Sequence, residues 1–257
     1  MSSVWVTVPT LDEVENIVQL VHGVRAAVPD AHILIVDDGS ADGTADKAEA
    51  LGAELGGIEV LRRPRKMGLG SAYRAGHAIG MARGYDVMVQ IDADLSHDPA
   101  ALPDLLAAVE RGADLAIGSR YVPGGSVPNW PRGRLLLSVW GNRYAGFVLG
   151  LRVRDTTAGY RAYRASILHA IDMESTHSTG YAFQIEMTYR AMHARGRIEE
   201  VPIAFTDRVR GTSKMSSRIV GEAMTLVTLW GLRDRVLRRL KPGRSAAPDL
   251  QDTRRSA

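Results

Sequence analysis

Two aspartates separated by one residue are the clearest candidates for chemistry in the sequence. Asp92 and Asp94 directly follow the apolar run at residues 87–91, which has the pattern of a buried strand. Carboxylates at positions i and i+2 of a turning chain can bind a hard cation such as Mg²⁺ or Mn²⁺, which prefers oxygen ligands and leaves coordination positions for substrate phosphates. A surface turn that caps the next helix would use the same residues, and an isolated Asp-X-Asp does not decide between the two.

A second group of acidic residues suggests contacts to a nucleotide. Asp38 lies in the turn at residues 37–40, which follows the apolar run at 33–36. Its carboxylate could accept hydrogen bonds from a ribose or a base, whereas Asp42 or Thr44 would cap the next helix. Glu13 follows the first apolar run, and it could accept from a base N–H or simply favour a helix N-terminus.

The elements that must position these side chains alternate between strand and helix patterns over the first 120 residues. Repeated β–α–β units predict an α/β fold with a mainly parallel sheet and helices on both faces. In such sheets ligands bind beyond the carboxyl ends of the strands. The polar groups at residues 37–40, 92–94 and 118–120 all fall at these ends, so we expect one cleft. The predicted strands are 4–8, 33–36, 58–61, 87–91 and 115–117, and the predicted helices are 12–28, 44–55, one after 68–70, and 99–111.

After residue 120 the pattern changes. An amphipathic helix is predicted at 132–151, and its apolar face comprises Leu136, Trp140, Tyr144, Phe147 and Leu151. Strands are predicted at 160–164 and 199–204, and helices at 183–194 and 218–240. Residues 1–241 are expected to form one domain, with a nucleotide- and metal-binding half at 1–120 and an acceptor- and membrane-facing half at 121–241. Residues 242–257 have the composition of a disordered tail.

Composition and charge limit the classes of function. The chain has 257 residues, 45% of them hydrophobic, which excludes a fibrous or disordered protein, and it has no cysteine for disulfides, zinc–thiolate sites or thiol nucleophiles. The net charge of +3 conceals a net of −9 in residues 1–114 and +12 in residues 115–257. The basic half indicates an anionic partner: nucleic acid, a membrane surface or a phosphorylated substrate. No secretory signal is visible, and the apolar run at 223–232 is shorter than the ~20 residues of a membrane span, so we expect a soluble or peripheral protein.

An ordered set of motifs resembles glycosyltransferase family 2 with the GT-A fold. The later motifs, at residues 155–163, 180–186 and 201–215, narrow the resemblance to dolichol- and polyprenol-phosphate mannose synthases, with the actinobacterial group as the nearest. The resemblance covers about residues 4–232, and the set is far more specific than any single motif. The earlier motifs are Val-Pro-Thr-Leu-Asp-Glu at 8–13, Val-Asp-Asp-Gly-Ser-Ala-Asp-Gly-Thr at 36–44, Lys-Met-Gly-Leu-Gly-Ser-Ala at 66–72, Asp-Ala-Asp-Leu-Ser-His at 92–97 and Gly-Ser-Arg-Tyr at 118–121.

The resemblance implies a role for individual residues on the donor side. Nucleotide contacts are implied for Pro9, Leu11, Glu13, Val36 and Asp38. The sugar diphosphate and its metal would lie at the second aspartate motif, and Arg208 with Lys214 would close over the donor. The residues implied there are Asp92, Ala93 and Asp94, with Ser96 at the third metal position.

The acceptor side, by the same resemblance, consists of Arg120, Arg134 and Ser138, which would bind a lipid phosphate. Asp94, Arg120 and Arg134 are the residues expected to carry catalysis, and Asp155 is expected to orient an arginine or a backbone turn. Two departures from the family pattern stand out. Leu11-Asp12 replaces a common Tyr-Asn, which removes an aromatic stack on the base, and Ser96 replaces a frequent Gln.

The implied reaction is inverting, metal-dependent transfer of mannose from GDP-mannose to polyprenyl phosphate, with Mg²⁺ or Mn²⁺ as cofactor. A phosphate monoester is largely a dianion at neutral pH, since its second pKa is about 6, and needs no general base. A UDP-glucose-dependent enzyme, a hydroxyl acceptor and an inactive nucleotide-binding scaffold are the alternatives. Expected partners are the two substrates and a membrane surface at the cytoplasmic face of the plasma membrane, with a membrane-anchored partner protein left open and nucleic acid excluded. Replacement of Asp94 or Arg120 by alanine should abolish transfer in a folded protein.

Overall fold

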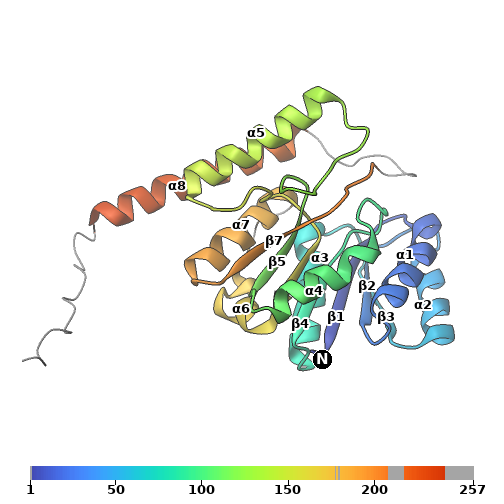
Figure 1. The fold of residues 1–257 in the computed structure, drawn as a ribbon. Helices are drawn as coiled ribbons and strands as arrows, with labels where there is room; N and C mark the ends of the chain where they lie inside the picture. The colour runs from blue at the N-terminus through green and yellow to red at the C-terminus, as the bar shows by residue number, and fades with distance from the viewer. Residues whose placement is uncertain (1, 177, 179, 208–216, 241–257) are drawn as a thin grey trace, which may run out of the picture.

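A seven-stranded sheet runs through the computed structural model, which describes residues 2–176, 178, 180–207 and 217–240, with the backbone alone at 217–220 and 235–240 (Figure 1). The strand order is β3-β2-β1-β4-β6-β5-β7. Every neighbouring pair is parallel except the two pairs that β6 makes with β4 and β5. The prediction of a mainly parallel sheet is therefore confirmed. The strands are β1 (Val4–Thr10), β2 (His32–Asp37), β3 (Ile58–Arg62), β4 (Val87–Gln90), β5 (Leu115–Ser119), β6 (Arg161–Arg164) and β7 (Ile198–Pro202).

Helices cover both faces of the sheet because its strands are apolar on both sides. Successive side chains of a strand point to opposite faces, and in β1 Val6 belongs to one core cluster while Trp5 belongs to the other. The first face is covered by α1 (Val14–Ala27), α2 (Thr44–Leu55) and α4 (Leu102–Glu110). The second is covered by α3 (Leu69–Ala82), α6 (Ala165–Ala170) and α7 (Gly180–His193).

Local signals explain most of the boundaries. The predicted helix at 99–111 is divided into a 3-10 turn, Pro99–Ala101, and α4. The turn begins where the Asp98 carboxylate accepts a hydrogen bond from the backbone N–H of Ala100 at 2.9 Å, as expected of an aspartate N-cap. The short helix α6 and a second 3-10 turn, Met173–Ser175, were not predicted.

Helices α5 (Arg132–Leu149) and α8 (Ser217–Leu240) lie side by side and extend past the sheet (Figure 1). Together with α7 they enclose a third core cluster, which contains Tyr144 at its edge and Leu151 inside it. The predicted apolar face of α5 is therefore wrong in these two residues, which pack inward, whereas Leu136, Trp140 and Phe147 are exposed. Among the described residues, no helix combines the length and apolar character that crossing a bilayer requires.

Candidate active site

The two aspartates of the Asp-X-Asp motif lie at the carboxyl end of β4, in different environments. The Asp92 side chain is 29% exposed, and one of its oxygens accepts a hydrogen bond from the Tyr73 hydroxyl at 2.7 Å. Burial, together with the charge of Asp92, raises the pKa of Tyr73 well above its usual value, so the hydroxyl stays protonated and donates. Asp94 is buried, and its Oδ1 accepts from the backbone N–H of Ser96 at 3.0 Å. Between them and Ser96, Leu95 has a φ of 60°, which bends the chain tightly around the carboxylates.

His97 lies beside the same carboxylates. Its ring is buried against Tyr160 and Phe205, and its Nδ1 is 4.0 Å from Asp92 Oδ2. Burial lowers the pKa of His97, so the ring is neutral near pH 7. Gly159 lies two residues before β6, and a Cβ there would lie 3.0 Å from Asp92 Oδ2. The space around Asp92 is thus bounded by the His97 ring and by a glycine whose replacement would press on the carboxylate.

A divalent cation fits this donor set. Asp92 is partly exposed, and the orientation of the Asp94 carboxylate is fixed by the hydrogen bond that it accepts from the Ser96 N–H. Both residues supply the hard oxygen ligands that Mg²⁺ and Mn²⁺ favour. Over the part of the chain that the structure describes, no group of three His, Cys, Asp or Glu side chains is arranged around a common point. This composition matches sites in which one or two carboxylates and substrate phosphates share the cation.

The residues expected to meet the nucleotide gather at the carboxyl ends of β1 and β2. Pro9 pairs in register with Val36, so the ends of these strands are adjacent. Glu13 accepts a hydrogen bond from the Asn16 amide at 2.8 Å at the start of α1, and Leu11 is half-buried nearby in sequence. Val36 is fully buried in the core and Ala93 is buried too, so neither presents an exposed side chain to a ligand.

Asp38 has partners that the sequence analysis did not anticipate. Its carboxylate is buried and paired with Arg63, whose Nε donates to Oδ1 at 2.5 Å. The other oxygen accepts from the backbone N–H groups of Met67 and Gly68 at 3.0 and 3.3 Å. Asp38 therefore ties the end of β2 to the loop that begins α3. Asp42 accepts from the N–H groups of Val14 and Thr44, the first residues of α1 and α2, but the N-cap of α2 is Gly43, so the predicted cap at Asp42 or Thr44 is wrong by one residue.

Arg120 and Asp155 form a buried ion pair at the end of β5. The Nε and Nη2 atoms of Arg120 donate to the two Asp155 oxygens at 2.7 and 2.6 Å, and its backbone N–H donates to the same carboxylate at 3.0 Å. Burial alone would lower the pKa of Arg120, but the charge and hydrogen bonds of Asp155 raise it. The prediction that Asp155 orients an arginine is confirmed. Nη2 also donates to Thr157 Oγ1 at 2.9 Å.

The remaining acceptor candidates lie around this pair, on α5. Ser138 Oγ accepts from the Tyr121 hydroxyl at 2.7 Å, and Tyr121 follows Arg120 in the chain. Arg134 donates to Asp207 at 2.7 Å. The Cζ atoms of Arg120 and Arg134 lie 5.6 and 4.0 Å from the centre of the Trp130 ring. The structure thus brings Arg120, Arg134 and Ser138 into one neighbourhood, whereas Arg208 and Lys214 lie outside the described residues.

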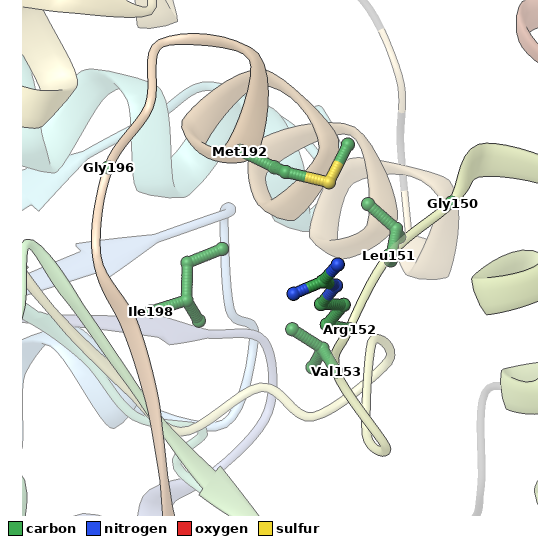
Figure 2. A pocket seen from close by; sticks show the side chains of 7 residues that line it. All are labelled: Gly150, Leu151, Arg152, Val153, Met192, Gly196 and Ile198. Atoms are coloured by element: carbon green, nitrogen blue, oxygen red, sulfur yellow. The ribbon is translucent and has the colours of Figure 1, made fainter.

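A cavity of about 250 Å³ lies elsewhere (Figure 2). Its walls come from the loop after α5, from the end of α7 and from Ile198, the first residue of β7. Since β7 runs parallel to β5, this is the amino end of the strands, opposite the edge that carries the aspartates and Arg120. None of the candidate site residues lines this cavity.

Comparisons with known proteins support the family that the sequence motifs indicate. The profile of Glycosyl transferase family 2 matches residues 5–172. A polyprenol monophosphomannose synthase from Mycolicibacterium smegmatis is 51% identical over 232 residues, which cover 90% of this chain and 88% of that protein. An undecaprenyl-phosphate mannosyltransferase from Micrococcus luteus is 52% identical over 228 residues, covering 89% and 93%.

The solved structures show the fold. Glucosyl-3-phosphoglycerate synthase from Mycobacterium tuberculosis, in complex with Mn²⁺, UDP and glucosyl-3-phosphoglycerate, superposes with a TM-score of 0.64 at 21% identity, covering 91% of this chain and 80% of that one. GalNAc-T7 with UDP, GalNAc and Mn²⁺ gives 0.61 at 15% identity, covering 89% and 48%. The expected GT-A fold is therefore confirmed.

Proposed function

The chain belongs to glycosyl transferase family 2, and we propose that it transfers mannose from GDP-mannose to polyprenyl phosphate with inversion, in a reaction that depends on Mg²⁺ or Mn²⁺. The observation that carries the proposal is the identity of about half of all positions to two full-length relatives, both named for transfer of mannose to a polyprenyl phosphate. The two alignments cover about 90% of the chain and therefore include most of the acceptor half, where enzymes of one fold differ in what they accept.

The chemistry suits an acceptor that is already an anion. The acceptor phosphate oxygen attacks the anomeric carbon, the bond from that carbon to the donor diphosphate breaks on the opposite side, and the nucleoside diphosphate departs with the electron pair. No proton has to be removed from a dianionic phosphate, so the reaction needs no general base. A cation held by Asp92 and Asp94 would neutralise charge on the departing diphosphate.

The arginines address the other difficulty, which is the approach of two anions. A guanidinium group matches a phosphate in shape and can donate two parallel hydrogen bonds. Arg134 is exposed, so a ligand can approach its charge directly. Arg120 is held by Asp155, so its guanidinium has a fixed orientation. Ser138, half-buried beside Tyr121, would add a neutral donor to the acceptor phosphate.

Incubation with labelled GDP-mannose, polyprenyl phosphate and Mg²⁺ or Mn²⁺ tests the proposal. We expect label in the organic phase that mild acid releases, and we expect EDTA to prevent its formation. A parallel reaction with UDP-glucose is the matched control. Label from UDP-glucose alone would reassign the donor, and an absence of lipid-linked label from both donors would refute polyprenyl-phosphate glycosylation.

We also propose that the exposed side of α5 and α8 lies against the membrane that holds the acceptor. Phe147 and Leu136 are 81% and 69% exposed, and Leu229 and Leu232 of α8 are exposed too. The arginines at 132 and 143 are exposed along α5. Apolar side chains flanked by basic ones are typical of a helix in the headgroup region, and basic residues favour the anionic cytoplasmic leaflet.

Replacing Leu136 and Phe147 together by serine should weaken binding to anionic vesicles about a hundredfold, because burying two such side chains contributes roughly 3 kcal/mol. Vesicle flotation over a range of lipid concentrations measures the effect. Leu55→Ser is the matched control, since Leu55 is an exposed leucine on α2 and should bind as the unmodified protein does. Undiminished binding of the double variant would mean that another surface meets the membrane.

A further inference from the structure

Trp130 contacts three segments around the candidate acceptor residues: the end of β5 with Arg120, the first turn of α5 with Arg134, and the segment after β7. It lies in the connection between β5 and α5, next to the start of the helix that bears Arg134. The Phe205 ring, which follows β7, meets it edge to face at 5.6 Å. Its indole Nε1 donates to Asp207 Oδ1 at 3.0 Å. The local sequence around this tryptophan does not reveal the arrangement, because two of its partners, Phe205 and Asp207, lie more than 70 positions further along the chain.

Two guanidinium groups contact this one ring. Arg134 Cζ is 4.0 Å from the ring centre and Arg120 Cζ is 5.6 Å from it. The two carbons are therefore at most about 10 Å apart, a separation at which one phosphate can accept hydrogen bonds from both guanidinium groups. Like charges at this separation repel, and attraction to the face of an indole offsets that repulsion.

The carboxylate of Asp207 contacts both Trp130 and Arg134. Its Oδ1 accepts from both Trp130 Nε1 and Arg134 Nη1, at 3.0 and 2.7 Å. One anionic oxygen is thus bound by an indole N–H and a guanidinium together, which is how a phosphate oxygen would be bound. Asp207 and Arg134 are both 44% exposed, so this pair can separate at modest cost when a competing anion arrives.

We propose that Trp130 is a positioning residue of the acceptor site. Its ring holds Arg120 and Arg134 at the spacing that one prenyl phosphate requires, and Asp207 occupies the place of a phosphate oxygen until the acceptor displaces it. This inference rests on the proposed function, since it specifies how that acceptor is recognised. Phe205 also lies 5.4 Å from Arg120, but within the described part of the chain Trp130 is the ring that both guanidinium groups approach.

The test compares Trp130→Leu with Trp130→Phe, using geranyl phosphate as an acceptor that needs no membrane. The leucine variant loses the aromatic face, and the KM for geranyl phosphate should rise about tenfold, as expected for two cation–π contacts. The phenylalanine variant keeps a face for both guanidiniums and should stay within about threefold of the unmodified protein. The KM for the sugar nucleotide should not change in either variant. Loss of general packing would instead lower kcat or raise both KM values.

Asp207→Asn provides an independent second variant. Removing the carboxylate that the acceptor must displace should lower the KM for geranyl phosphate about threefold, the size expected of an exposed ion pair. An unchanged acceptor KM in Trp130→Leu, or an equal loss in the leucine and phenylalanine variants, would overturn the positioning role. A raised acceptor KM in Asp207→Asn would overturn the displacement. If the unmodified protein transfers no sugar to geranyl or polyprenyl phosphate, it is the proposed function that fails.

Discussion

Replacing Asp94 by asparagine should lower kcat by about a thousandfold while leaving the protein folded. The carboxylate is the buried member of the pair at the end of β4, and asparagine keeps its size and its acceptor for the Ser96 N–H. What would be lost is a carboxylate charge on the proposed cation, whose contribution to stabilising a departing diphosphate would be several kcal/mol. Each 1.4 kcal/mol is about tenfold in rate, so a loss of about 4 kcal/mol corresponds to the expected change.

Asp98→Asn is the matched control, in the same loop and with the same chemical change. Asp98 caps the turn at Pro99–Ala101, and asparagine caps a helix as well as aspartate does. Steady-state transfer and equilibrium binding of Mn²⁺ in the presence of GDP should both be unaffected in this control and both be reduced in Asp94→Asn. Full Mn²⁺ binding by Asp94→Asn would remove this residue from the metal site.

Replacing Arg120 by alanine should abolish transfer and, in addition, lower the free energy of unfolding by about 3–5 kcal/mol. The sequence alone predicts only the first effect. The second follows because Asp155 is fully buried, and removing its cation leaves an unpaired buried charge. Chemical denaturation of the variant measures the stability, and transfer to polyprenyl phosphate measures the activity.

Arg120→Lys separates the two effects. Lysine keeps a positive charge opposite Asp155 but cannot donate to it with the paired geometry of a guanidinium, nor stack on Trp130 as a plane. We expect most of the stability to return while transfer stays low. Arg62→Ala is the stability control: its ion pairs with Asp46 and Glu49 are exposed, so unfolding should stay close to that of the unmodified protein. Full activity of Arg120→Lys would show that charge alone suffices at this position.

The order of strands and helices could be predicted from the sequence because each element carries its own periodicity. The first five strands and their helices were placed within a few residues, and Asp42 and Thr44 marked the start of α2. The position of β6 between β4 and β5 could not be predicted. Its four residues pair antiparallel with residues 44 to 77 positions earlier in the chain, and nothing in its local pattern specifies those partners.

The candidate site shows the same contrast between residues that a local motif reveals and partners that come from distant elements. Asp92 and Asp94 were found because they are neighbours after a buried strand, and Asp155 because its motif matched a family. The partners that fix these groups come from distant elements: Tyr73 from α3 holds Asp92, and Arg63 holds Asp38. Long-range hydrogen bonds of this kind leave no local signature, since neither residue type nor spacing differs from that of an ordinary surface helix or loop.

The pairing of α5 with α8 affects how the enzyme meets its two substrates. The acceptor candidates Arg134 and Ser138 lie on the same helix as the exposed Leu136 and Phe147. An enzyme attached through that side would collect the sugar nucleotide by diffusion in three dimensions and the prenyl phosphate by diffusion in two. Turnover would then follow the surface density of the acceptor in the bilayer rather than its bulk concentration, and inert phospholipid would slow the enzyme simply by dilution.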